Sequence, residues 1–271
     1  MSERATEARN PRASALASFS TTEILELMND EDATVPAAVR AALPAIARAV
    51  DAIVAALAEG GHVIYVGAGT SGRLGVLDAS EAPPTFGVER DLFRGIIAGG
   101  DTALRNSVEG AEDVAANGAR DLGAIRRAHD VVVGISASGR APYVIAAVEA
   151  GRKAGSPTVA VTCNPGSPLA AAADIPIVVE VGPEVLAGSS RLKAGTATKL
   201  VLNMLSTAAM IRAGRTKGDL MVDLRATNAK LRERAVRMVR DETGLDEAAA
   251  RDRLEKNGWN VRAALATDRQ R

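Results

Sequence analysis

The sequence predicts a doubly wound α/β domain on a five-stranded parallel sheet, with helices before it and a small helical appendage after it. Two patterns carry this prediction: short, continuous apolar segments, and helical patterns that follow them through loops rich in Gly and Ser. Continuous apolar strands that alternate with helices are typical of a parallel sheet covered on both faces. The expected strands cover residues 62–66, 93–97, 131–135, 158–162 and 175–181.

Helical patterns precede this sheet. Residues 1–20 are polar, and we expect them to extend over the surface or onto a partner subunit. Residues 20–22 are N-cap candidates for an apolar pattern that stops at the acidic residues 30–32. A longer amphipathic pattern over 35–58 stops at Gly60, as a helix C-terminus does.

Helical patterns also follow the sheet. A long helix is expected over 189–212, and a further one over 226–239 leads into the tail. In the tail Asp246 is a capping candidate, and Trp259 is expected to anchor a small core. Three parts are therefore expected: an N-terminal arm with helices over 1–60, a sheet domain over 61–225 and a C-terminal helical region over 226–271.

Charge and composition narrow the classes of function. The 271 residues carry 33 Lys plus Arg and 33 Asp plus Glu, so the formal net charge is zero, and only 2% are aromatic. No nucleic-acid partner is expected, because such binders carry a basic excess and aromatic platforms. One cysteine, Cys163, cannot form an intrachain disulfide, and two histidines with one thiol are too few for an ordinary zinc site. We expect a cytoplasmic protein without a metal, a signal peptide or a membrane-spanning run.

Two loops of similar sequence follow the first and third expected strands. Residues 66–73 and 133–140 both leave an apolar strand and end in Ser-Gly-Arg. Backbone N–H groups and short hydroxyls at a helix N-terminus favour an anion, and a phosphate suits that geometry. The residues expected to bind it are Thr70, Ser71, Ser136, Ser138 and Gly139.

The first of these loops also matches GxGxxG, the dinucleotide fingerprint, at residues 67–72. That fingerprint expects an acidic residue at the end of the second strand, about twenty positions on. The next strand here ends near Asp101, which is too far along the chain. A compact phosphorylated ligand is therefore favoured over a nucleotide.

The start of the helix expected over 189–212 carries Ser190, Arg191 and Lys193. A helix N-terminus normally avoids positive charge, so the two cations suggest that an anion is supplied from outside. The alternative is that both side chains simply reach solvent.

Carboxylates occur beside both loop regions. Glu81 lies just beyond the first anion loop, and Glu112 and Asp113 follow the loop of the second strand. Two carboxylates at the C-terminal ends of neighbouring strands could act as acid and base on a bound sugar. The alternative, that Glu112 and Asp113 only favour the dipole of a helix start, stays open.

Both histidines are expected to be structural or solvated. His62 and His129 precede strands, so they belong to the N-terminal edge of the sheet. Ligand sites of open α/β sheets lie at the opposite edge.

Longer motifs give the chain a family resemblance. They are Thr6–Asn10 (TEARN), Asn29–Asp32 (NDED), Gly67–Gly87 (GAGTSGRLGVLDASEAPPTFG), Val108–Asp113 (VEGAED), Ser136–Pro142, Cys163–Pro165, Gly188–Thr196 and Leu220–Asn228 (LMVDLRATN). On these motifs, which span nearly the whole chain, the sequence resembles the N-acetylmuramic acid 6-phosphate etherases, which have the sugar isomerase (SIS) fold.

The resemblance implies an activity. It is removal of the lactyl ether from N-acetylmuramate 6-phosphate, giving N-acetylglucosamine 6-phosphate and D-lactate in cell-wall recycling. The family is placed among the lyases because the ether leaves by elimination before water adds back. Glu81 matches the family's proton donor, and Glu112 matches the second active-site residue, for which we hypothesise a base role at C2. No cofactor and no metal are implied.

The resemblance also implies where the substrate binds and how the chain assembles. Ser71, Ser136, Ser138, Ser190 and Arg191 match positions that hold the phosphate and the sugar. Members of this fold usually pair as homodimers with the site near the interface. Two other functions on the same fold are an aldose–ketose isomerase of phosphosugars, which would use a well-placed histidine, and a non-catalytic phosphosugar-binding regulator.

Overall fold

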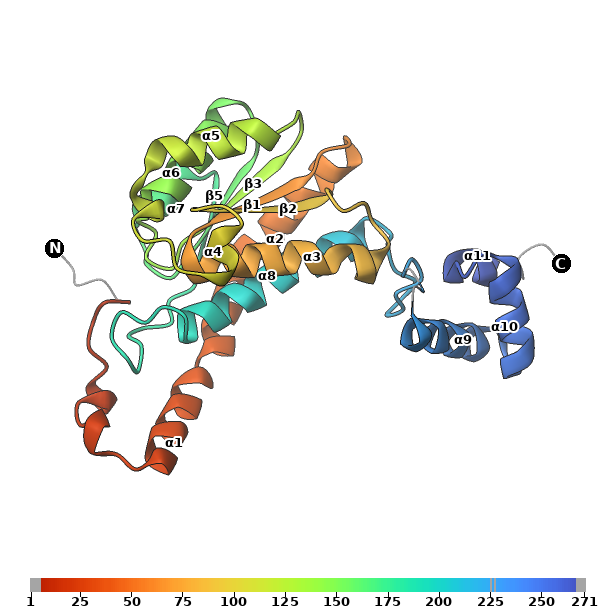
Figure 1. Cartoon of the computed structure of the whole chain (residues 1–271), viewed down its shortest axis with the longest axis horizontal. Coiled ribbons are helices and arrows are strands. Elements are labelled where there is room, and N and C mark those ends of the chain that lie inside the picture. The colour runs from red at the N-terminus through yellow and green to blue at the C-terminus, as the bar shows by residue number, and fades with distance from the viewer. Residues whose placement is uncertain (1–5, 225, 227, 267–271) are drawn as a thin grey trace. The chain divides into compact units, whose positions relative to one another are not determined.

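A computed structural model describes residues 6–224, 226 and 228–266 (Figure 1). Its five strands are all parallel and lie in the order β2-β1-β3-β4-β5. They are β1 (Val63–Gly67), β2 (Phe93–Ile97), β3 (Val131–Ile135), β4 (Thr158–Thr162) and β5 (Ile175–Val178). This confirms the predicted doubly wound sheet; only β5 is clearly shorter than expected.

Helices cover both faces of the sheet (Figure 1). Those in the sheet region are α3 (Gly69–Phe86), α4 (Thr102–Arg105), α5 (Ala115–Ile125), α6 (Pro142–Lys153), α7 (Pro168–Ala172) and α8 (Lys193–Arg212). Before them come the 3-10 turns η1 (Pro11–Ala13) and η2 (Leu16–Ser18), then α1 (Thr21–Asp32) and α2 (Val35–Ala58); a third turn, η3 (Ala111–Asp113), precedes α5. α6 and α7 pack against β3 and β4 on one face, and α2 packs against β3 and β5 on the other.

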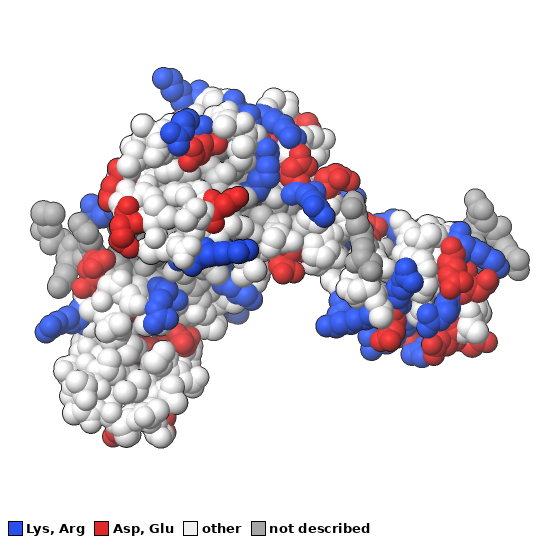
Figure 2. Space-filling view, in the orientation of Figure 1, with Lys and Arg blue, Asp and Glu red and all other residues white. Residues whose placement is uncertain are grey.

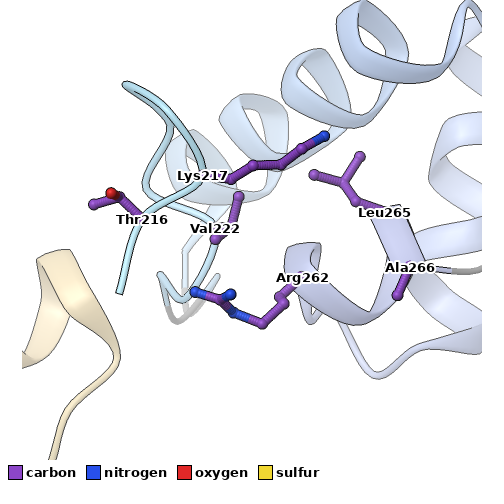
Figure 3. A pocket seen from close by; sticks show the side chains of 6 residues that line it. All are labelled: Thr216, Lys217, Val222, Arg262, Leu265 and Ala266. Atoms are coloured by element: carbon purple, nitrogen blue, oxygen red, sulfur yellow. The ribbon is translucent and has the colours of Figure 1, made fainter. Parts of the chain in front are cut away.

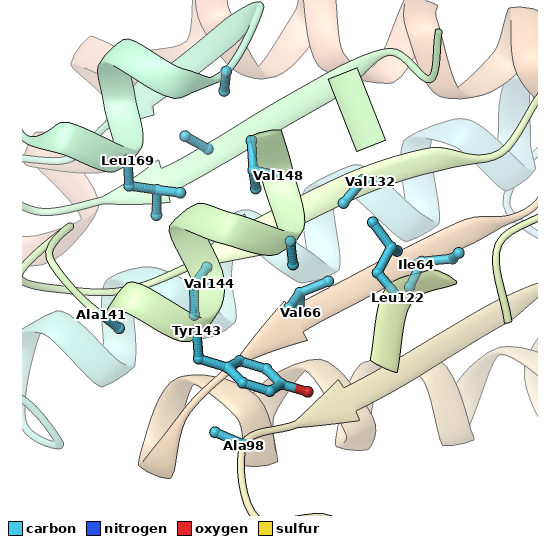
Figure 4. Close-up of a cluster of buried hydrophobic side chains, with 13 residues drawn as sticks. Ile64, Val66, Ala98, Leu122, Val132, Ala141, Tyr143, Val144, Val148 and Leu169 are labelled. Atoms are coloured by element: carbon cyan, nitrogen blue, oxygen red, sulfur yellow. The ribbon is translucent and has the colours of Figure 1, made fainter. Parts of the chain in front are cut away.

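One hydrophobic core lies between the sheet and α6 (Figure 4). Ile64 and Val66 point to this face from β1, as the two-residue period of a strand requires, and Val132 joins them from β3. Tyr143, Val144 and Val148 meet them from α6. Burial of each such side chain contributes about 1.5–3 kcal/mol, so this layer fixes how the strand ends are arranged.

The first helix begins where the sequence predicts. The Ser20 hydroxyl accepts a hydrogen bond from the Glu23 amide at 3.3 Å, and the Glu23 carboxylate accepts one from the Ser20 amide at 2.7 Å. This reciprocal pair is a capping box, and a cap of this kind contributes about 1 kcal/mol.

Residues Thr21–Ala58 are long and apolar enough to cross a membrane, by length and composition. The expectation that no run reaches that length was therefore wrong. The buried residues of α2 follow helical spacing: Val35, Val39, Ala42, Ile46, Ala49, Val50, Ile53 and Ala56. Because α2 packs against β5 and β3, this apolar stripe serves as a core face of the sheet domain.

A buried carboxylate ties the middle of α3 to its neighbours. Asp78 on α3 is 7% exposed and accepts hydrogen bonds from the Tyr65 hydroxyl at 2.9 Å, Asn203 at 2.8 Å and Ser206 at 3.2 Å. Burial raises the pKa of Asp78, although the three hydrogen bonds oppose that change. β1, α3 and α8 are thereby held in one arrangement.

The chain forms two compact units. One comprises Met1–Ala79 and Asp91–Ala209, and the other comprises Ser80–Arg90 and Met210–Arg271. The N-terminal helices, expected as a part of their own over 1–60, pack within the first unit. The C-terminal helices, expected over 226–271, share the second unit with residues 80–90.

The second unit has a small core of its own. α9 (Ala229–Thr243), α10 (Glu247–Lys256) and α11 (Val261–Ala266) enclose buried residues that include Val239 and Leu254. Trp259 packs against this cluster, as predicted, and the Arg232 guanidinium lies 4.9 Å from its ring centroid. The Leu220–Asn228 motif leads into this unit, and its residues 225 and 227 lie outside the described part.

Candidate active site

The sheet order places a ligand crevice between β1 and β3. The chain runs from β1 outward to β2, then returns past β1 to β3, so the direction of winding reverses between them. Open parallel sheets bind ligands at this point, beyond the carboxyl ends of the strands. A pocket of about 250 Å³ lies there, lined by Thr6, Glu7, Ala68, Gly69, Thr70, Ser71, Glu112, Ile135, Ser136, Ala137, Ser138, Gly188 and Ser190.

The β1–α3 turn contributes Thr70 and Ser71 to this pocket. The turn is tight: a Cβ at Gly67 would lie 2.5 Å from the amide nitrogen of Gly72, so glycine is required there. α3 starts at Gly69 and is 18 residues long. Its positive dipole end and these two hydroxyls therefore form one wall suited to an anion.

The β3–α6 loop supplies the opposite wall. Ser136 and Ser138 both line the pocket, and their hydroxyl oxygens lie 3.4 Å apart. Gly139, also predicted to bind substrate, does not line it. A Cβ at Gly139 would lie 2.2 Å from the Ser167 hydroxyl oxygen, and its φ is +66°, so this glycine allows close packing of the loop against Ser167.

Glu112 also lies in the pocket, as predicted. It belongs to η3, which starts after Gly110 at φ +71°. Arg73 supports the preceding segment, because its guanidinium donates to the carbonyl oxygens of Leu104 at 3.2 Å and Asn106 at 3.3 Å. A smaller cavity of about 150 Å³ adjoins the site and shares Glu112 with it.

Glu81 is not among the residues that line this pocket. It is an exposed residue of α3. It also belongs to the second unit, whereas Glu112 belongs to the first. Within the first unit, Glu112 joins the hydroxyl loops at the pocket.

Three residues at the start of α8 and just before it are predicted to bind the substrate, and the structure places only one of them in the pocket. Ser190 lines the pocket and Arg191 is exposed, outside the lining. Lys193 is 3% exposed, and its ammonium group donates to Glu31 at 2.7 Å. The prediction that Lys193 holds the substrate is therefore corrected to an internal ion pair.

The beginning of α8 is capped by a second buried carboxylate. Glu184 accepts hydrogen bonds from the backbone amides of Lys193 and Ala194, both at 3.0 Å. Burial raises the pKa of Glu184, and these amide hydrogen bonds lower it in part. The positive end of α8 is thus already occupied by a protein carboxylate.

Two polar side chains of the pocket are not among the predicted site residues. Thr6 and Glu7 come from the N-terminal arm, which returns to the site. The arm is fixed by the buried Thr6, whose hydroxyl oxygen accepts from Asn164 at 2.9 Å. The TEARN motif was the available signal, but it had no local pattern that would link it to strand ends.

Neither histidine nor the cysteine lines the pocket. His62 bonds to Asp130 at 3.0 Å and His129 pairs with Glu59 at 2.6 Å, both at the edge where the strands begin. Cys163 is 3% exposed, and burial raises the pKa of its thiol to about 12. In the described part of the chain, no three His, Cys, Asp or Glu side chains gather as metal ligands.

A different cavity, of about 220 Å³, lies within the second unit (Figure 3). Its two cations are already paired: Lys217 with Glu242, and Arg262 with Asp223. Charged side chains crowd the surface of α9 to α11 (Figure 2). The crevice at the strand ends, with open hydroxyls and carboxylates, is the better candidate site.

Comparison with known proteins decides the family. The N-acetylmuramic acid 6-phosphate etherase of Jannaschia sp. (strain CCS1) is 55% identical over 260 residues, which cover 96% of this chain and 82% of that protein. That of Symbiobacterium thermophilum is 56% identical and covers 96% of this chain and 87% of that protein. The chain belongs to the N-acetylmuramic acid 6-phosphate etherase family.

Models of domain families agree with this membership of the etherase family. One described as the glucokinase regulatory protein N-terminal SIS domain matches residues 45–152, and one described as the SIS domain matches residues 111–208. A solved phosphoheptose isomerase from Francisella tularensis has a TM-score of 0.58 at 22% identity, covering 71% of this chain and 100% of that one. A phosphoheptose isomerase from Neisseria gonorrhoeae has a TM-score of 0.54 at 23% identity, and the match covers 70% of this chain and 98% of that one. These structures show the fold, which is the predicted SIS fold.

Proposed function

We propose that this protein cleaves the lactyl ether of N-acetylmuramic acid 6-phosphate, giving N-acetylglucosamine 6-phosphate and D-lactate, as a carbon–oxygen lyase that also consumes water. The observation that carries the proposal is the identity of about 55% with etherases over 96% of the chain. The pocket agrees with it, because it combines an anion-binding wall with a carboxylate. The degraded sugar is a cell-wall amino sugar, so the reaction serves peptidoglycan recycling.

The phosphate is assigned to the end of the pocket formed by α3 and the serine loop. Thr70, Ser71, Ser136, Ser138 and Ser190 offer hydroxyl groups, and the start of α3 offers backbone N–H groups. A dianion gains from both, since hydrogen bonds to charged acceptors are the stronger kind. Arg191 is exposed beside Ser190 and is assigned a supporting contact.

Glu112 is assigned as the base. In the open-chain sugar the proton on C2 is acidified by the aldehyde, and Glu112 removes it. The C2–H electron pair becomes the C2–C3 double bond, the C3–O bond breaks, and the lactyl oxygen leaves with a proton. Water then adds to C3 while a proton returns to C2, so the net change is hydrolysis of the ether.

Glu81 is assigned as the proton donor to the leaving oxygen and later as the activator of water. The family resemblance implies a homodimer with the site near the interface, so we assign Glu81 to the site of a second subunit. Apolar exposure on the helices concerned supports pairing: Leu77, one turn before Glu81 on α3, is 52% exposed, and Met204 on α8 is 36% exposed.

The activity is tested by incubating the protein with N-acetylmuramic acid 6-phosphate in deuterated water and measuring D-lactate and the sugar product. We expect equal amounts of both products, with deuterium at C2 of N-acetylglucosamine 6-phosphate. Failure to release D-lactate rejects the function. Release of D-lactate without deuterium at C2 of the sugar rejects an elimination in which the abstracted proton exchanges freely with the solvent.

The shared site is tested by mixing two inactive variants, Glu81→Ala and Glu112→Ala, after subunit exchange. If each site takes one glutamate from each subunit, a hybrid dimer holds one intact site and one doubly altered site. Random exchange should then restore roughly a quarter of the wild-type activity. If both glutamates of a site belong to one subunit, no hybrid site is intact and no activity returns.

An aldose–ketose isomerase is the alternative enzyme. The solved phosphoheptose isomerases share the fold, but His62 and His129 lie at the edge of the sheet opposite the pocket, where neither can open a sugar ring. Ketose formation from glucosamine 6-phosphate would favour it. A binding regulator, suggested by the match to the glucokinase regulatory protein domain, would bind the sugar phosphate without turnover. The buried free thiol of Cys163 suits the reducing cytoplasm as the site of the reaction.

A further inference from the structure

The N-terminal arm brings a second carboxylate to the pocket, one to which the proposed reaction gives no role. Glu7 lines the pocket together with Glu112. A Cβ at Gly188 would lie 3.3 Å from the carboxylate oxygen of Glu7, so the carboxylate lies against the backbone of the loop that carries Ser190. Within the described residues, the carboxylate of Glu7 has no hydrogen-bond donor.

The position of Glu7 is fixed by anchors on both sides of it. Thr6 is 2% exposed and accepts from Asn164, which also donates to the carbonyl oxygen of Ala137 in the serine loop at 2.9 Å. Asn10 is 6% exposed, and its side chain accepts from the Arg12 amide at 2.9 Å.

Beyond Asn10, the arm is tied to the ion pair under α8. Arg12 bonds to Asp30 at 2.7 Å and to Glu31 at 3.2 Å, and Glu31 pairs with Lys193. Glu7 is therefore held between two structured points, so its carboxylate reaches the pocket on a fixed backbone.

The negative charge of the Glu7 carboxylate decides which part of the ligand it can bind. It repels the phosphate, since both are anionic acceptors, so the phosphate belongs at the α3 end. Its two oxygens instead suit neutral donors, and the hydroxyl groups of an open-chain sugar are such donors. The wall formed by α3 and the serine loop thus suits the phosphate, and Glu7 suits the sugar hydroxyl groups.

We propose that Glu7 is a sugar-binding residue that accepts hydrogen bonds from hydroxyl groups of the substrate and so orients its carbon chain toward Glu112. This inference rests on the proposed function for the identity of the sugar phosphate. It predicts that Glu7 has opposite effects on the two parts of the ligand: it strengthens binding of the sugar and weakens binding of the phosphate.

The test is calorimetric binding of N-acetylglucosamine 6-phosphate and, separately, inorganic phosphate. Glu7→Gln should weaken binding of N-acetylglucosamine 6-phosphate about tenfold or more, because a charged hydrogen-bond acceptor becomes an amide. Inorganic phosphate should bind equally tightly or more tightly, because a nearby negative charge is removed. Glu26→Gln makes the same charge change on the exposed face of α1 and should alter neither constant.

Two results overturn the inference. If Glu7→Gln weakens the binding of both ligands by the same factor, Glu7 only shapes the pocket. If it weakens neither, Glu7 does not touch the sugar. Because the measurement needs no turnover, it is separate from the D-lactate assay: a protein that binds in the predicted pattern but releases no lactate refutes the proposed function and leaves the role of Glu7 standing.

Discussion

The two edges of the sheet hold carboxylates in opposite ways. Where the strands begin, Asp130 is fully buried and accepts from the His62 ring at 3.0 Å, Arg94 at 2.8 Å and two backbone amides. Where the strands end, Glu7 and Glu112 are exposed, and no described residue donates a hydrogen bond to them. A satisfied carboxylate serves the fold, whereas an open one beside hydroxyl loops is available to a ligand.

Replacing Glu112 should give the largest effect on activity and almost none on stability. We expect Glu112→Gln to lower kcat for D-lactate release by about 10²–10⁴-fold, the usual contribution of a positioned acid or base. The midpoint of urea unfolding should stay at the wild-type value, because the side chain is exposed. A variant that retains kcat would remove Glu112 from the chemistry.

Replacing Asp130 should have the reverse effect. Asp130→Ala leaves Arg94 without its buried partner, so the free energy of unfolding should fall by about 3–5 kcal/mol. Activity per folded molecule should not change. Asp252→Ala is the matched control: it breaks an exposed pair with Lys256 and should cost less than about 1 kcal/mol. Equal losses in the two variants would contradict the comparison, as would a fall in kcat for Asp130→Ala.

Replacing Arg73 tests whether its contacts hold Glu112 in position at the edge where the strands end. Its contacts with the carbonyl oxygens of Leu104 and Asn106 hold the chain that leads to Glu112. Arg73→Ala should lower kcat about tenfold by misplacing the base, while the inhibition constant of inorganic phosphate stays the same. If phosphate binding falls in proportion, Arg73 supports the wall formed by α3 and the serine loop instead.

The buried ion pair between Glu31 and Lys193 should also respond to pH. Burial alone would raise the pKa of Glu31, but hydrogen bonds from Lys193 and Asn10 lower it below the ordinary 4.5. A lowered folded-state pKa stabilises the protein above the ordinary value, and this stabilisation is lost as the pH falls through the folded-state pKa. Glu31→Gln should therefore be less stable than wild type at pH 7, with a gap that narrows below about pH 4.5 in urea titrations. A constant gap would show that ionisation of Glu31 is not responsible.

The sequence predicted what local pattern can encode. The strands, the Ser20 cap and the serine loops follow from apolar runs, capping residues and glycine turns, each visible within a few positions. The roles of Lys193 and Glu7 depend on contacts with residues about 160 positions away, Glu31 and the loop of Asn164. Such long-range pairing leaves no periodicity in the sequence. The local pattern therefore predicts Lys193 as a phosphate ligand and predicts no role for Glu7.

Glu81 shows another limit of local reasoning. Its distance along the chain from the first anion loop is short, yet it belongs to the second unit and does not line the pocket. The family resemblance matches Glu81 to the proton donor, and its placement in the site of a second subunit is our proposal.

D-lactate release from N-acetylmuramic acid 6-phosphate tests the central claim most directly, with wild type and Glu112→Gln compared at equal concentrations of folded protein. We predict that wild type releases D-lactate and N-acetylglucosamine 6-phosphate in equal amounts and that the variant loses about 10²-fold or more of the rate. Absence of release by wild type, or equal release by both proteins, would contradict the assignment of the strand-end pocket as the etherase site.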